Sequence, residues 1–88
     1  MKVLKKDLDK ALKERKDYWL RRGQLITQIM IRDGILQQEL ADAVGVTRGT
    51  MSRILHGKIS GSTTLPALAV ALGMSYTELM TLGIRQNN

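Results

Sequence analysis

Apolar residues recur along the chain with the spacing of amphipathic helices, and glycines separate one apolar group from the next. The clearest group is Leu65, Leu68, Ala69 and Leu72, which follow the i, i+3, i+4, i+7 pattern of one helix face. No stretch alternates apolar and polar residues in the way that a half-buried strand does. The pattern therefore predicts an all-α fold.

Two short helices are predicted in the middle of the chain, and suitable end residues delimit them. The first covers residues 37–44, and Gly45 can adopt the positive φ of a sharp turn. Thr47 is a good N-cap for the second, which covers residues 48–56. Two helices joined by so tight a turn predict a helix-turn-helix motif over residues 37–57.

Two further helices are predicted in the last third of the chain. Pro66 is acceptable only in a first turn, which places the start of one helix near Thr63 or Thr64. Ser75 and Glu78 have the spacing of a capping box, in which the two side chains satisfy backbone N–H groups at a helix start. A last short helix should therefore follow Ser75.

The N-terminal segment is predicted to be a basic amphipathic helix over residues 2–22. Leu4, Leu8, Leu12 and Trp19 form a narrow apolar stripe with charged residues between them. The stripe could pack on the domain or on a second copy, the basic face could touch DNA phosphates, or the segment could bind a partner protein. A membrane surface is the poorest fit, because acidic residues interrupt the positive face.

Gly23 either ends this helix or lies inside one helix that continues through residues 24–32. The basic N-terminal helix therefore either precedes the first helix of the domain or merges with it. We divide the chain into an N-terminal helix (1–22), a helix-turn-helix domain (23–83) and a flexible tail (84–88).

The net charge of +6 and the pI near 10.1 favour a polyanionic partner. Residues 1–22 hold nine Lys/Arg and four Asp/Glu, whereas residues 23–88 hold five and four. Any DNA binding by the motif must therefore rest on a few well-placed cations. The absence of cysteine excludes disulfides and agrees with a cytoplasmic location, and a single histidine leaves no basis for a metal site. No apolar run reaches the roughly 20 residues of a membrane span.

The chain resembles the Cro/repressor-type helix-turn-helix proteins, the lambda-repressor-like family. The residues that carry the resemblance are Gln37, Leu40, Ala41, Gly45, Val46, Thr47, Ser52, Ile54, Gly57 and Lys58. The later segment LPALAVALGMS, from Leu65 to Ser75, matches a second pattern of the family. The resemblance covers residues 23–83 and implies a five-helix DNA-binding domain.

The resemblance also implies roles for individual residues. Base contacts in the major groove would come from Arg48, Gly49, Thr50 and Arg53. Phosphate contacts would come from Gln37, Thr47, His56 and Lys58. A dimer surface would include Ile59, Tyr76, Met80 and Leu82.

Each role has a structural alternative. Arg48 or Arg53 could be solvated, or could pair with Asp42 on the protein surface. Gln37 could serve only as a helix-end hydrogen-bonding residue, and His56 could be an ordinary surface residue.

The sequence departs from the family pattern within the domain. Leu36 stands where a Ser or Thr cap is usual, so the start of that helix must be held differently. Met30 and Leu55 stand where many members carry an Arg and a Glu that pair, so packing should replace that ion pair.

The expected function is that of a sequence-specific transcriptional regulator, a repressor that binds a palindromic double-stranded DNA operator as a homodimer. The alternative is an antitoxin or another protein-interaction module that binds its partner through residues 1–22. The sequence has no nucleophile–base pair and no phosphate-binding glycine loop, so we expect no enzymatic activity and no cofactor.

Overall fold

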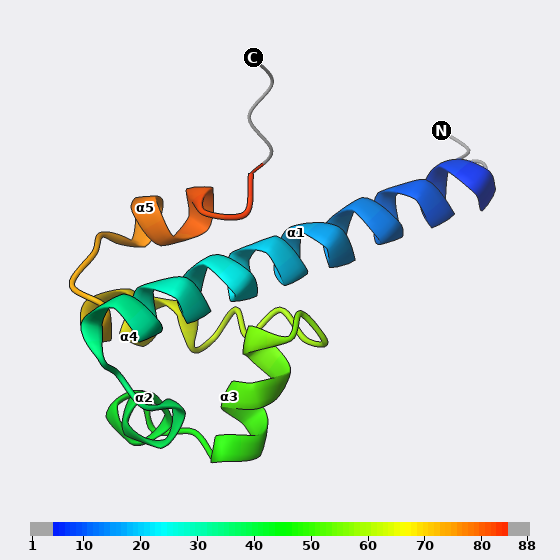
Figure 1. Cartoon of the computed structure of the whole chain (residues 1–88). Helices are drawn as coiled ribbons and strands as arrows, with labels where there is room; N and C mark the ends of the chain where they lie inside the picture. The colour runs from blue at the N-terminus through cyan, green and yellow to red at the C-terminus, as the bar shows by residue number, and fades with distance from the viewer. Residues whose placement is uncertain (1–4, 85–88) are drawn as a thin grey trace.

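The computed structural model describes residues 5–84, with side chains from residue 12 onward (Figure 1). Its five helices are α1 (Lys5–Asp33), α2 (Gln37–Val44), α3 (Arg48–Leu55), α4 (Leu65–Ala71) and α5 (Tyr76–Thr81). No strand occurs within residues 5–84. The prediction of an all-α, five-helix domain is confirmed. In Figure 1, α1 crosses the molecule, and its N-terminal half extends beyond the other four helices.

Helix α1 passes through Gly23 without a break, so the basic N-terminal helix merges with the first helix of the domain. A Cβ atom at Gly23 would lie only 2.1 Å from the backbone oxygen of Leu55 in α3. Glycine at this position therefore lets the backbones of α1 and α3 approach closely, and its role is packing rather than helix termination.

The core is aliphatic and draws on all five helices. Its buried apolar residues are Ile26, Met30, Leu40, Ala41, Met51, Ile54, Leu55, Leu65, Leu68, Ala69 and Leu79. Met30 and Leu55, which stand where many family members carry an ion pair, are each only 6% exposed and belong to this core. Burial of apolar side chains thus takes the place of that pair, at no cost in charge desolvation.

The helix ends are held largely as the sequence predicts. Gly45 has φ 78° after α2, and the Thr47 side chain accepts a hydrogen bond from the backbone N–H of Thr50. Ser75 and Glu78 form the predicted capping box of α5. At the start of α2 the Leu36 side chain makes no capping hydrogen bond. Instead, the Leu36 N–H donates to the carboxylate of Glu39 at 3.0 Å, which supplies half of a capping box from inside the helix.

Three side chains within residues 18–22 make hydrogen bonds that join α1 to distant parts of the chain. The Tyr18 hydroxyl donates to the Met80 carbonyl oxygen at 2.5 Å, and Arg21 Nε donates to the Gly83 carbonyl oxygen at 2.9 Å. Arg22 Nη2 donates to the carbonyl oxygen of Ser60 in the loop after α3. Residues 18–22 therefore pack on the domain, and they fix the direction in which the rest of α1 projects.

Arg22 is the most unusual residue of the core, because its charged side chain is only 1% exposed. Its guanidinium lies 5.3 Å from the centre of the Tyr18 ring, a cation–π distance, and its buried Nε has no hydrogen-bond partner. The charge is thus stabilised by an aromatic face and a carbonyl oxygen rather than by a carboxylate.

We expect Arg22→Met to leave the free energy of unfolding within about 1 kcal/mol of the original value, because an apolar side chain of similar length removes an incompletely satisfied charge. Arg22→Ala should lower the free energy of unfolding by roughly 2 kcal/mol, because the packing of the aliphatic stem is also lost. Urea unfolding of both variants checks this. Equal losses in the two variants would mean that the guanidinium contacts, not the packing, stabilise the fold.

None of the helices described within residues 5–84 combines the length and the apolar character required to cross a membrane.

Candidate nucleic-acid interface

The outer face of α3 presents polar side chains because its inner face is used by the core. Met51, Ile54 and Leu55 are buried. On the other side, Arg48, Gly49 and Arg53 are exposed, whereas Thr50 and Ser52 are half-buried. The helical period therefore places the four predicted base-contact residues together on one surface.

Hydrogen bonds order the side chains on the outer face of α3. The Thr47 hydroxyl donates to the Thr50 hydroxyl oxygen at 3.0 Å, and Arg53 Nη2 donates to the same oxygen at 3.3 Å. The N-cap is thereby connected to the arginine nearly two turns later. This preorganisation lowers the entropy that Arg53 would lose on binding a ligand.

The starts of α2 and α3 lie together. Gln37 Nε2 donates to the backbone carbonyl oxygen of Arg48 at 3.3 Å. Gln37 is the first residue of α2, and its hydrogen bond brings its side-chain amide to the start of α3. Both N-termini carry partial positive charge, which favours an anion such as a phosphate.

Two further predicted residues lie at the opposite end of α3. His56, the C-cap of α3, and the exposed Lys58 line a shallow hollow of about 220 Å³ with Ser52 and Arg53. His56 Nδ1 lies 2.7 Å from the Ser52 carbonyl oxygen, so this nitrogen carries a proton in the hydrogen bond. Lys58 extends the basic surface of α3 past its C-terminus.

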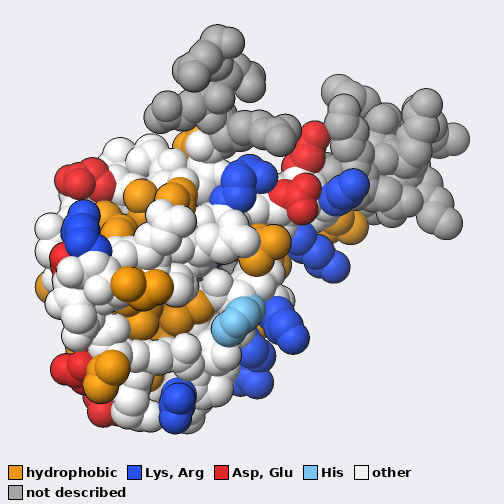
Figure 2. All heavy atoms as spheres, viewed as in Figure 1, with side chains coloured by type: hydrophobic (Ala, Val, Ile, Leu, Met, Phe, Trp, Pro, Cys, Tyr) orange, Lys and Arg blue, Asp and Glu red, His pale blue; other side chains and the backbone are white. Residues whose placement is uncertain are grey.

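No cation of this surface is paired with a carboxylate among the side chains that the structure describes. Among the described side chains the ion pair is Arg32–Asp33, at the far end of α1, where the hydrogen bond from Arg32 lowers the pKa of Asp33. Asp42, the expected alternative partner of Arg48 or Arg53, instead accepts a hydrogen bond from Gln38 at 2.8 Å. In Figure 2, Lys and Arg side chains follow the edge of the molecule from α3 towards α1, with the histidine beside them.

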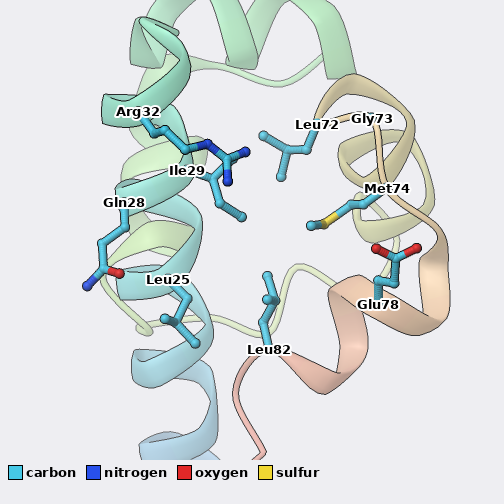
Figure 3. Close-up of a pocket in the computed structure, with 9 residues that line it drawn as sticks. All are labelled: Leu25, Gln28, Ile29, Arg32, Leu72, Gly73, Met74, Glu78 and Leu82. Atoms are coloured by element: carbon cyan, nitrogen blue, oxygen red, sulfur yellow. The ribbon is translucent and has the colours of Figure 1, made fainter.

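A separate groove lies away from α3, between α1 and the segment from α4 to α5 (Figure 3). It measures about 680 Å³ and is lined by Leu25, Gln28, Ile29, Arg32, Leu72, Gly73, Met74, Glu78 and Leu82. Its titratable lining groups are a guanidinium and a carboxylate, with no nucleophile beside a base. No group of three or more metal-ligating side chains is found in the part of the chain that the structure describes.

Comparison with known families identifies the domain that carries this surface. The model of the Cro/C1-type HTH DNA-binding domain matches residues 26–83, a segment that contains all of α2 to α5 and the end of α1. The chain belongs to this family. No curated protein and no solved structure gives a significant match.

Membership of the Cro/C1-type family establishes a DNA-binding domain of the kind found in transcriptional regulators. The family match begins after residues 18–22, so it does not include the side chains that fasten α1 to Ser60, Met80 and Gly83.

The structure brings seven of the eight predicted DNA-contact residues onto α3 and its two ends, and it joins Gln37 to them through Arg48. Tyr18 and Arg22 were not among the residues predicted to have a special role. Their spacing of four residues, which places an aromatic ring and a cation on one helix face, was the available signal. Three of the four predicted dimer residues belong to α5 or its end: Tyr76 is 47% exposed, whereas Met80 and Leu82 pack partly against the core. The fourth, Ile59, directly follows Lys58 and is half-buried.

Proposed function

We propose that this protein is a transcriptional repressor that binds a palindromic operator in double-stranded DNA as a homodimer, with α3 in the major groove. The supporting observation is the exposed face of α3, on which Arg48 and Arg53 make no ion pair with a described carboxylate. An arginine in this setting can donate two hydrogen bonds to guanine O6 and N7. Occupation of promoter DNA would be enough for repression, without catalysis or a cofactor.

The proposed phosphate contacts surround the base-reading face. Gln37 and Thr47 stand at the starts of α2 and α3, and His56 and Lys58 stand at the end of α3. Phosphate contacts at both ends would fix the depth and the orientation of the helix, which base contacts alone cannot do. We assign this task to residues 23–83, with residues 1–22 as an N-terminal extension and residues 84–88 as a tail.

Selection of bound duplexes from a random double-stranded DNA pool tests this proposal. We expect an enriched site with two related half-sites, about one helical turn or about 10 base pairs apart between their centres. Enrichment of DNA without a common sequence would contradict sequence-specific binding. Enrichment of a single half-site would contradict the homodimer.

The proposed dimer surface contains Ile59, Tyr76, Met80 and Leu82. Tyr76, and Ile84, which follows α5 and is 57% exposed, offer apolar area that a second copy could cover. Light scattering of the free protein at micromolar concentration should give twice the mass of one chain, 9.8 kDa. A monomer that stays monomeric on operator DNA would contradict the dimer.

A second function has one specific observation in its favour. Leu12 and Leu20 on α1 are 43% and 41% exposed, and the N-terminal half of α1 stands clear of the other helices (Figure 1). An antitoxin or a similar interaction module could bind its partner protein there. Copurification of a small protein at equal stoichiometry, lost on removal of residues 1–16, would support this function.

Gly49 offers a sharp test of close approach to DNA. A Cβ atom at this position would meet nothing closer than 4.0 Å, and its φ is not positive, so the fold itself does not require glycine. Gly49→Ala should raise the free energy of unfolding by up to about 1 kcal/mol through helix propensity. It should weaken operator binding, because the added methyl group would separate the backbone from the base edges. Urea unfolding and DNA titration measure the two effects, and a gain in both would contradict close approach.

A further inference from the structure

We propose that Lys13 and Lys16, on the projecting half of α1, bind the DNA backbone and extend the interface beyond the helix-turn-helix motif. This inference rests on the proposed function, because it concerns the same DNA. It gives a role to the basic N-terminal segment, which lies outside the matched residues 26–83.

Helix α1 contacts the end of α3. Gly57, the residue between His56 and Lys58, lies against the backbone of Leu20. A Cβ atom at Gly57 would fall 2.6 Å from Leu20 Cα. Leu20 and Gln24 also line one shallow hollow with Leu55 and His56. The phosphate-contact end of α3 and this face of α1 are therefore continuous.

The helical register of α1 places Lys13 and Lys16 on the face that contacts α3. Lys16 lies one helical turn before Leu20, and Lys13 lies seven residues before it, so all three occupy the same face. At 1.5 Å per residue, Lys16 and Lys13 lie about 6 Å and about 10 Å along the helix from Leu20. Lys13 and Lys16 line a common hollow with Leu12 and Asp17, and both lysines are exposed. The basic side chains thus follow one another along the surface in the order Arg53, Lys58, Lys16 and Lys13.

The projecting half of α1 is held rigidly where it leaves the domain. The bonds of Tyr18 to Met80, Arg21 to Gly83 and Arg22 to Ser60 hold α1 at the point where it leaves the domain. A helix held in this way presents its lysines in fixed places, whereas a flexible arm would lose entropy on binding.

The choice of DNA over another occupant follows from charge. Residues 1–22 carry nine Lys/Arg and four Asp/Glu, so a second copy of this helix would meet like charge. The rest of the chain is almost neutral, with five and four, and needs additional cations for a polyanion. Figure 2 shows the Lys and Arg side chains continuing from the level of α3 onto α1, with acidic side chains among them.

The test compares the full-length protein with Lys13→Gln/Lys16→Gln. Binding to the selected operator and to a scrambled duplex is measured over a range of salt concentrations. Each lost phosphate contact should lower the magnitude of the log K against log salt slope by about 0.9, so the double variant should lose about 1.8. At about 0.15 M salt this corresponds to roughly 30-fold weaker binding, equal for the two duplexes. Circular dichroism should show an unchanged helix content.

Two further variants make the result specific. Arg15→Gln/Arg32→Gln removes the same charge from other faces of α1, where Arg15 lies over the Trp19 ring and Arg32 pairs with Asp33. This arginine variant should change the log K against log salt slope by much less than the lysine variant does. Asp17→Asn removes the carboxylate that lines the hollow with Lys13 and Lys16, and it should tighten binding to both duplexes several-fold.

The inference is overturned if the lysine variant behaves like the original protein or like the arginine variant while operator binding persists. It is also overturned if the lysine variant releases a copurifying acidic protein and leaves DNA binding unchanged. If the original protein shows no preference for any sequence, the proposed function itself fails, and that result is distinguishable from both.

Discussion

Replacing Arg53 or Arg48 with alanine is expected to reduce the affinity for the operator by roughly 5- to 150-fold and to relax the preference for guanine at one position of each half-site. The range corresponds to about 1–3 kcal/mol for a two-hydrogen-bond contact with a base. We expect the larger effect at Arg53, because its guanidinium is already held by Thr50 on the exposed face of α3.

Titrations of the single variants with the operator, with operators altered at one guanine and with unrelated DNA measure this. Lys58→Ala is the matched control, since it removes one charge at the end of the same helix. It should weaken all sequences alike and reduce the salt slope by about 1. If Arg48→Ala and Arg53→Ala weaken binding to all sequences equally, the two arginines contact phosphates and not bases. If neither variant weakens binding, neither arginine belongs to the interface.

Gly23→Ala is expected to lower the free energy of unfolding by about 3 kcal/mol or more, at the upper end of the range for overpacked cores. The new methyl group would lie 2.1 Å from the Leu55 carbonyl oxygen, so α1 and α3 would have to separate. Separation would loosen the packing of Ile26 and Leu55, both of which are buried. The obstacle is backbone, which cannot move aside as the end of a side chain can.

Gly49→Ala is the control for Gly23→Ala, because the same chemical change is made in open space on α3. In urea unfolding, Gly23→Ala should therefore lower the free energy of unfolding, whereas Gly49→Ala should raise it. A stability gain for Gly23→Ala, as expected of a glycine that merely weakens a helix, would contradict the close approach of α1 and α3.

Local chemistry explains why the boundaries of the short helices could be predicted. Thr47, Ser75 and Gly45 act on backbone groups within a few residues of themselves, and the structure confirms each of them at its helix end. The core positions of α2, α3 and α4 follow from helical periodicity in the same way.

The behaviour of Gly23 could not be predicted, because its cause lies far away in the sequence. In the sequence alone, Gly23 is compatible with a helix end or with a weak position inside a helix. Its packing role follows only from the proximity of Leu55 in the structure. The same holds for Arg22, which a charge count assigns to a solvated helix, whereas its partner is the carbonyl oxygen of Ser60. Sequence periodicity carries no information about contacts of this separation.

The candidate interface was predictable to a different degree for each residue. The exposed face of α3 follows from periodicity, so Arg48, Gly49 and Arg53 lie where the sequence analysis expects them. The hydrogen bond from Gln37 to the carbonyl oxygen of Arg48 depends on how α2 crosses α3, and it is visible only in three dimensions.

Sequence-specific DNA binding by α3 is the central claim, and one measurement tests it most directly. The dissociation constant of the unmodified protein is measured for its selected operator and for a scrambled duplex of equal length, at about 0.15 M salt. The account predicts a ratio of at least about a thousandfold in favour of the operator. A ratio near one would contradict it.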